Sequence, residues 1–95
     1  MPLVSQPAKL IQSHMDRIWP HMEREKVLGS KLQLHKDQAA SAVEALDAMI
    51  SPHAKLTDGQ ASVISGYVID YMAGRPDYPS FLERIAIATY INSCR

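Results

Sequence analysis

The chain has 95 residues, and its ten Lys and Arg residues balance ten Asp and Glu residues, so its formal net charge is zero. A chain of this length is expected to form one domain, which here spans residues 1–95. Zero net charge provides no long-range field that would steer the protein onto nucleic acid or an anionic membrane. Hydrophobic residues make up 46% of the chain and charged residues 21%, which excludes the composition typical of a disordered protein.

Cysteine content and hydropathy indicate the cellular compartment in which the protein is expected. Cys94 is the only cysteine, which excludes an internal disulfide and argues against a cysteine-based metal site. The longest apolar stretch, residues 85–91, is too short to cross a membrane, and the N-terminal segment lacks the basic start and apolar run of a signal peptide. These features predict a cytoplasmic protein without membrane contact.

The first predicted helix begins at about Gln6, with Pro7 in its first turn. Pro20 has no amide proton and disfavours the α conformation of Trp19, so we expect the helix to stop or bend there and to restart. The pair Gly29–Ser30 is predicted to end this helical region. The predicted apolar stripe consists of Leu10, Ile11, Met15, Ile18, Trp19 and Met22, continued by Val27 and Leu28.

The segment Lys31–His35 alternates polar and apolar residues, but no second alternating segment exists for it to pair with as a strand. It is therefore either helical or an extended connector. Asp37 is the predicted N-cap of the next helix, which the pair Ser51–Pro52 ends. Glu44 and Asp47 are expected to point outward. The predicted buried face consists of Ala39, Ala42, Val43, Leu46, Met49 and Ile50.

Two capping boxes predict the starts of the last two helices. Thr57 and Gln60 form a T-x-x-Q arrangement, and Ser80 and Glu83 form S-x-x-E. The first of these helices is expected to stop at Gly74, with a turn before the second. Its predicted inward side chains are Val63, Ile64, Tyr67, Val68, Tyr71 and Met72. The last helix carries Phe81, Leu82, Ile85, Ala86, Ala88, Tyr90 and Ile91.

Small residues, Ala61, Ser62, Ser65 and Gly66, lie along one side of the helix that follows Thr57. Glycine inside a helix costs about 1 kcal/mol relative to alanine, so a packing reason is expected for Gly66. A close crossing with another helix of the same chain is the simpler interpretation, and a partner or homodimer surface is the alternative. The whole pattern predicts an all-α fold, a compact bundle of four or five short helices, for which the small core also makes a homodimer credible.

No residue pattern in the chain predicts catalysis. There is no P-loop, dinucleotide fingerprint, nucleophile elbow or suggestive carboxylate pair, so we expect neither an enzyme nor a cofactor. The four histidines, His14, His21, His35 and His53, do not have metal-ligand spacing, and no metal site is expected.

Candidate partner-binding residues come from the first and fourth predicted helical segments. Two histidines and two arginines recur at three- and four-residue steps and form a mildly basic stripe, which Asp16, Glu23 and Glu25 dilute. Trp19, beside the expected bend, is the predicted exposed anchor, whereas filling of the core is the alternative role. The predicted partner-binding residues are His14, Arg17, Trp19, His21, Arg24, Tyr67 and Tyr71.

Residues 56–85 begin with LTDGQ, which opens a helix, and continue through a polar turn to YPSFLERI, which opens another. This order resembles the small helical domains of phage replicative helicase loaders and helicase inhibitors, which show an L-T/S-x-x-Q start followed by an aromatic-proline-small segment. A single proline precedes Ser80, where that family often has two. The resemblance implies a protein that docks on a ring ATPase and regulates it, and it assigns no functional residue. In size, neutrality and lack of motifs the chain is also similar to small phage inhibitors of host machinery, including anti-CRISPR proteins.

These features predict a non-catalytic protein-binding module, of the phage or mobile-element type, that docks on a host protein or nucleoprotein complex and inhibits or recruits it. The alternative is a nucleic-acid-associated accessory factor of the helicase-loader type, acting in DNA replication. Direct sequence-specific DNA binding is not expected, because the one helix-turn-helix candidate places Pro76 and Pro79 at the start of its recognition helix.

Overall fold

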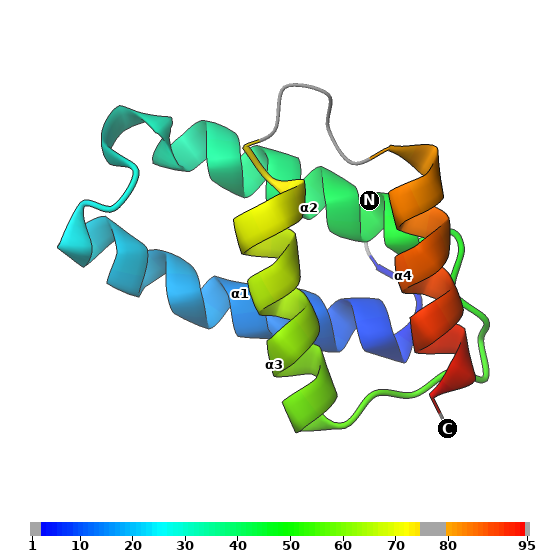
Figure 1. The fold of residues 1–95 in the computed structure, drawn as a ribbon. Coiled ribbons are helices and arrows are strands. Elements are labelled where there is room, and N and C mark those ends of the chain that lie inside the picture. The colour runs from blue at the N-terminus through cyan, green and yellow to red at the C-terminus, as the bar shows by residue number, and fades with distance from the viewer. Residues whose placement is uncertain (1–2, 75–79, 95) are drawn as a thin grey trace.

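The computed structural model describes residues 3–74 and 80–94, and these residues form α-helices and no strand (Figure 1). The elements are α1 (Gln6–Glu25), a 3₁₀ turn η1 (Gly29–Lys31), α2 (Leu32–Asp47), α3 (Asp58–Tyr67), a π-helical segment η2 (Val68–Met72) that extends α3, and α4 (Phe81–Ser93). In Figure 1, α1 and α2 run side by side in opposite directions, α3 crosses them, and α4 stands beside one end of α2. The all-α prediction is confirmed.

The helix α1 begins where predicted and continues without a break through Pro20. Its N-cap is Ser5, whose Oγ accepts a hydrogen bond from the amide of Ala8 at 3.2 Å. The predicted stop at Pro20 is therefore wrong. Proline cannot donate to the carbonyl of Asp16, but both residues are exposed, so water can bind that carbonyl instead.

The end of α1 comes earlier than predicted. Lys26 adopts the left-handed conformation (φ 55°), and the next amide, that of Val27, donates to the carbonyl of Met22 at 3.2 Å. The amide of Lys26 itself donates to the carbonyl of Glu23, also at 3.2 Å. These two hydrogen bonds define a Schellman motif, which forms here without glycine. Val27 consequently leaves the apolar stripe and is 60% exposed.

The segment Lys31–His35 is helical, since the 3₁₀ turn leads directly into α2 at Leu32. Asp37 is therefore inside α2, where it accepts a hydrogen bond from the side chain of Gln33 at 3.0 Å, and its predicted N-cap role is wrong. The helix ends at Asp47, three residues before the predicted Ile50, and turns follow it.

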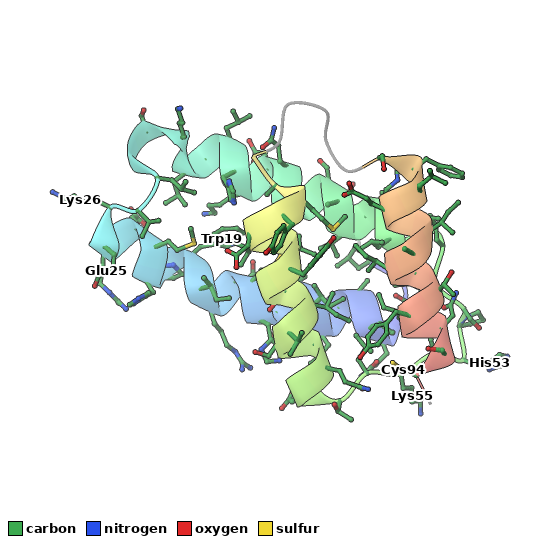
Figure 2. All side chains as sticks on the ribbon, in the orientation of Figure 1. Trp19, Glu25, Lys26, His53, Lys55 and Cys94 are labelled. Carbon is green, nitrogen blue, oxygen red and sulfur yellow. The ribbon has the colours of Figure 1, made fainter. Side chains whose placement is uncertain are left out.

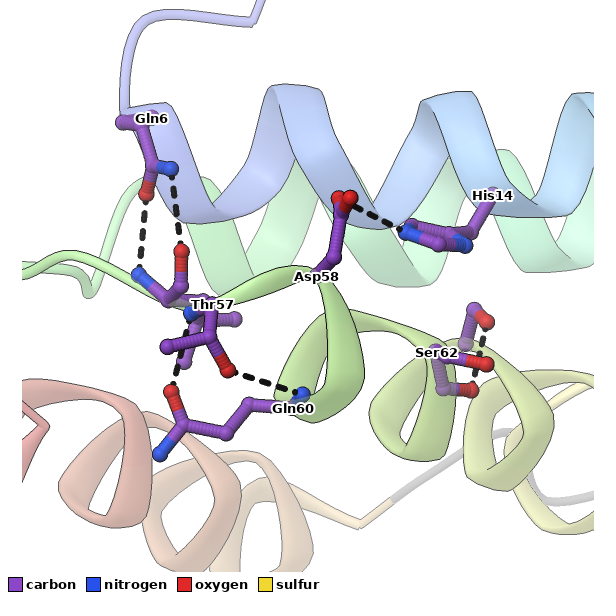
Figure 3. Close-up of polar contacts among 8 residues, drawn as sticks. Gln6, His14, Thr57, Asp58, Gln60 and Ser62 are labelled. Carbon is purple, nitrogen blue, oxygen red and sulfur yellow. Dashed lines mark hydrogen bonds and ion pairs between the residues drawn. The ribbon is translucent and has the colours of Figure 1, made fainter.

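The start of α3 is clamped onto α1 (Figure 3). The side-chain amide of Gln6 donates to the carbonyl of Leu56 at 3.2 Å and accepts from the amide of the same residue at 3.0 Å. The predicted capping box is present: the Gln60 amide donates to Oγ1 of Thr57 at 3.2 Å, and the Thr57 amide donates to Oε1 of Gln60 at 2.9 Å. Together these bonds fix the residue at which α3 begins and the side that it turns inward.

The end of η2 is held by α2. The Nε2 atom of His35 lies 2.8 Å from the carbonyl oxygen of Ile69, and the amide of Gly74 donates to Oε1 of Gln38 at 2.7 Å. The last carbonyls of a helix have no intrahelical partner, and the carbonyl of Ile69 is one of these. His35 contacts this carbonyl, and Gln38, one turn further along α2, accepts from the first amide beyond the C-cap. Gly74 has a φ of 81°, as expected for the predicted helix end. The predicted turn through residues 75–79 lies outside the described residues.

The core collects apolar side chains from all four helices. Its largest fully buried side chains are Ile11 and Met15 of α1, Val43 and Leu46 of α2, Val68 and Met72 of η2, and Ile91 of α4. Of the small residues, Ala61 and Ser65 are fully buried, whereas Ser62 is exposed. The contact between α3 and α1 is the most extensive between any two elements, which supports the intramolecular crossing.

Two glycine substitutions of the same kind are expected to act in opposite directions. A Cβ at Gly66 would meet no atom within 4 Å, so Gly66→Ala should raise the free energy of unfolding by about 0.5–1 kcal/mol. A Cβ at Gly74 would lie 2.9 Å from Nδ1 of His35, and φ is positive there, so Gly74→Ala should lower it by more than about 1 kcal/mol. Urea unfolding followed by circular dichroism measures both. A loss of stability in Gly66→Ala would contradict the open space found at that position.

Asp47, predicted to point outward, ties the start of α1 to the end of α2. Its Oδ1 accepts from the amide of Ser5 at 2.8 Å, and its Oδ2 accepts from the amide of Val4 at 3.0 Å. Partial burial alone raises the pKa of this carboxyl, but the hydrogen bonds from Ser5 and Val4 and the charge of Lys9 outweigh it, so that the pKa lies below the ordinary 3.8.

A carboxyl with a lowered pKa in the folded state stabilises the fold above its unfolded-state pKa and loses that contribution as the pH falls through the folded-state pKa. We therefore expect the free energy of unfolding to decrease as the pH is lowered below about 4. The substitution Asp47→Asn should reduce this slope, and Asp16→Asn at an exposed position is the control. Urea titrations at a series of pH values measure the effect; an unchanged slope in Asp47→Asn would show that the carboxylate does not stabilise the junction.

Candidate protein-binding surface

Trp19 is a core residue and not the exposed anchor that was predicted. It is 5% exposed and points into the space between α1 and α2 (Figure 2). Its ring packs edge-on against the ring of His35, with centroids 6.1 Å apart. The α1 helix continues through Pro20, and the indole of Trp19 faces the interior. The prediction is wrong, and the alternative role in the core is correct.

The basic stripe of α1 is continuous, because the helix that carries it is unbroken. Arg17, His21 and Arg24 are exposed along it. The side chain of His14 is only 16% exposed, and its Nε2 lies 3.4 Å from Oδ1 of Asp58 at the start of α3 (Figure 3). The structure therefore keeps three members of the stripe at the surface and places the fourth beside a carboxylate.

Tyr67 and Tyr71 lie at the surface with Val63, which is 74% exposed. The prediction that these three side chains point inward is wrong. Ile64, Val68 and Met72 occupy the inward side of the same helix together with the residues that follow each of them. The residues that precede each of them, Val63, Tyr67 and Tyr71, lie on the other flank and are exposed. The two tyrosine rings stack on each other, with centroids 5.0 Å apart and planes inclined by 24°.

Helix α4 is anchored at its C-terminal end and exposed at its N-terminal end. Asn92 accepts a hydrogen bond from the amide of Ser51 at 2.7 Å and donates to the carbonyl of Met49 at 3.2 Å. Ala88 and Ile91 are buried nearby. In contrast, four large apolar residues of α4 are exposed, namely Phe81, Leu82, Ile85 and Tyr90.

We use the name α3–α4 face for the exposed sides of α3, η2 and α4, which carry seven large apolar residues around a groove between the two helices. Both helices contact the α1–α2 pair more extensively than they contact each other. A wholly apolar groove of about 180 Å³ runs between them, lined by Val63, Ile64, Tyr67, Ile87 and Tyr90. The α3–α4 face consists of Val63, Tyr67, Tyr71, Phe81, Leu82, Ile85 and Tyr90.

Sequence reasoning identified the two tyrosines of this face and missed its α4 half. The missed signal is the distribution of apolar residues around α4, because Phe81, Leu82 and Tyr90 point to sides other than the buried side of Ala88 and Ile91. A helix that is apolar on several sides needs more than one packing partner.

The described part of the chain contains no cluster of three His, Cys, Asp or Glu side chains that could hold a metal ion. Cys94 is buried, with its Sγ 3.3 Å from the carbonyl of Tyr90 and 3.5 Å from Nε2 of Gln60. None of the helices described is both long enough and apolar enough to span a bilayer. Among these residues, the α3–α4 face holds seven of the ten large apolar side chains that are exposed.

Comparisons with protein-family models, curated proteins and solved structures find no match for this chain.

The burial of Trp19 predicts a stability effect. Trp19→Ala should lower the free energy of unfolding by about 3–5 kcal/mol, because it leaves a cavity between α1 and α2. His21→Ala, at an exposed position of the same helix, is the control and should change stability by less than about 0.5 kcal/mol. Chemical denaturation measures both. If Trp19→Ala had the stability of the wild-type protein, the core role of Trp19 would be contradicted.

Proposed function

We propose that this protein is a non-catalytic protein-binding module that docks on its partner through the α3–α4 face. The observation that supports the proposal is the exposure of seven large apolar residues on two adjacent helices. Covering apolar surface is favourable by about 25 cal/mol per Å², and large contiguous apolar surfaces mark interaction sites. Tyrosine is also enriched among the residues that contribute most to binding energy.

The partner in this proposal is a host macromolecular machine that the module inhibits or recruits in the cytoplasm. The resemblance of residues 56–85 to helicase loaders and inhibitors makes a ring-shaped ATPase the first partner to test. Most residues in that stretch lie in α3, η2 and the first turns of α4, so the resemblance and the exposed face involve the same part of the chain. The docking mode would be a helix or loop of the partner in an apolar groove.

A second function, association with nucleic acid, is favoured by the unbroken course of α1. It keeps Arg17, His21 and Arg24 exposed on one continuous helix, where they can meet phosphates. Binding of this kind weakens steeply with salt because it releases counterions, whereas apolar docking does not require such dependence.

Substitutions on the α3–α4 face should weaken partner capture and leave the fold intact. Val63 and Leu82 are 74% and 76% exposed, so Val63→Glu and Leu82→Glu remove little buried contact. Each should reduce capture of the partner at least about tenfold, because a charge then has to be buried in the interface. Affinity purification of the tagged protein from host lysate, with quantitative mass spectrometry, measures the loss.

The matched control is Val27→Glu, which makes the same change at a 60% exposed valine outside the face. Val27 follows Lys26, which lies at the end of the molecule remote from α4 (Figure 2). Equal loss of capture in all three variants would contradict the assignment of the face. Loss of capture on nuclease treatment, or in Arg17→Ala and Arg24→Ala but not in the face variants, would support the nucleic-acid function instead.

A further inference from the structure

We infer that α4 opens as a unit: it leaves the rest of the fold and unwinds while α1, α2 and the continuous α3–η2 helix stay packed. The native protein then alternates between a closed form, which is the structure described above, and an open form without a docked α4. This inference goes beyond the proposed function and does not depend on it.

Few side chains of α4 are buried. Ile91 is the one large apolar side chain among its 13 residues that is buried, and the small Ala88 is buried as well. A segment that buries few apolar side chains has a low free energy of local opening. The α3–η2 helix, in contrast, buries four large apolar side chains, those of Ile64, Val68, Ile69 and Met72.

The other helices form a packed unit without α4. Helices α1, α2 and α3–η2 contact one another more extensively than α4 contacts any of them. Figure 1 shows α4 beside one end of α2, whereas α3 crosses both α1 and α2. The hydrogen bonds from Gln6 to Leu56, and from His35 and Gln38 to the end of η2, do not involve α4. Departure of α4 therefore leaves these contacts and hydrogen bonds in place.

The side-chain hydrogen bonds that tie α4 to the turns after α2 can be replaced by water. Asn92 accepts from the amide of Ser51 and donates to the carbonyl of Met49, and both bonds are at the exposed C-terminal end of α4. Isolated helices shorter than about 12–15 residues are marginal in water. Once it is released, α4 is thus expected to unwind, and its backbone amides become accessible to solvent.

Opening of α4 also removes one wall of the apolar groove. Ile87 and Tyr90 of α4 line the groove opposite Val63 and Tyr67 of α3. The groove is therefore complete in the closed form and absent from the open form.

Native-state hydrogen exchange of the purified 95-residue chain, measured amide by amide by NMR at a series of low urea concentrations, tests the inference. The amides of α4 should share one level of protection, at least about tenfold lower than that of the slowest amides of α1 and α2. Their exchange should depend weakly on urea, because opening of one helix exposes little surface. The slowest amides should show the full urea dependence of global unfolding.

Two variants distinguish opening of α4 from unfolding of the whole chain. Asn92→Ala removes two hydrogen bonds that exist in the closed form alone, so it should speed exchange of the α4 amides about tenfold. Gly66→Ala is the control, because it stabilises α3, which remains helical in the open form. It should slow the slowest amides about two- to fivefold and leave the α4 amides unchanged.

Exchange of the α4 amides at the rate of the slowest amides of α1 overturns the inference, because α4 then opens only with the whole chain. Protection that falls gradually toward residue 93 also overturns it, since that pattern is fraying of a helix end. Equal slowing of the α4 amides in Gly66→Ala contradicts it as well, because α3 then opens together with α4. These measurements use no partner, so their failure leaves the proposed function to be decided by the lysate capture described above.

Discussion

The packing of α3 and η2 against α1 and α2 decides which apolar side chains of the second half of the chain remain in water. Ile64, Val68 and Met72 are turned into the core, and Ile69 and Ala73, about 100° further round the helix, are buried as well. Val63 and Tyr67 are offset by about 100° in the opposite direction, and they lie toward α4 and solvent. The helix carries apolar residues on more of its circumference than the core can cover. The exposed face is thus a direct consequence of the rotation of α3.

That rotation is fixed by polar side chains at the two ends of the α3–η2 helix. Gln6 of α1 pairs with both backbone groups of Leu56 before the helix, and His35 and Gln38 of α2 satisfy backbone groups after it. Each of these bonds supplies a partner to a backbone group in the last turn of the helix or in the segments that flank it. These hydrogen bonds add to the core contacts in positioning the helix, and rigid positioning favours binding because less entropy is lost on docking.

The sequence by itself determined the features that depend on local backbone chemistry: the all-α class, the start of α1 at Gln6, the capping box of Thr57 and Gln60, and the helix end at Gly74. Caps and glycine conformations act within a few residues, so they can be read directly. Only the tertiary structure decided that Trp19 is buried, that α1 continues through Pro20, and that α4 exposes its apolar sides. These outcomes depend on which helices lie against each other, and a helix with apolar residues on several sides does not specify which side its own chain will cover.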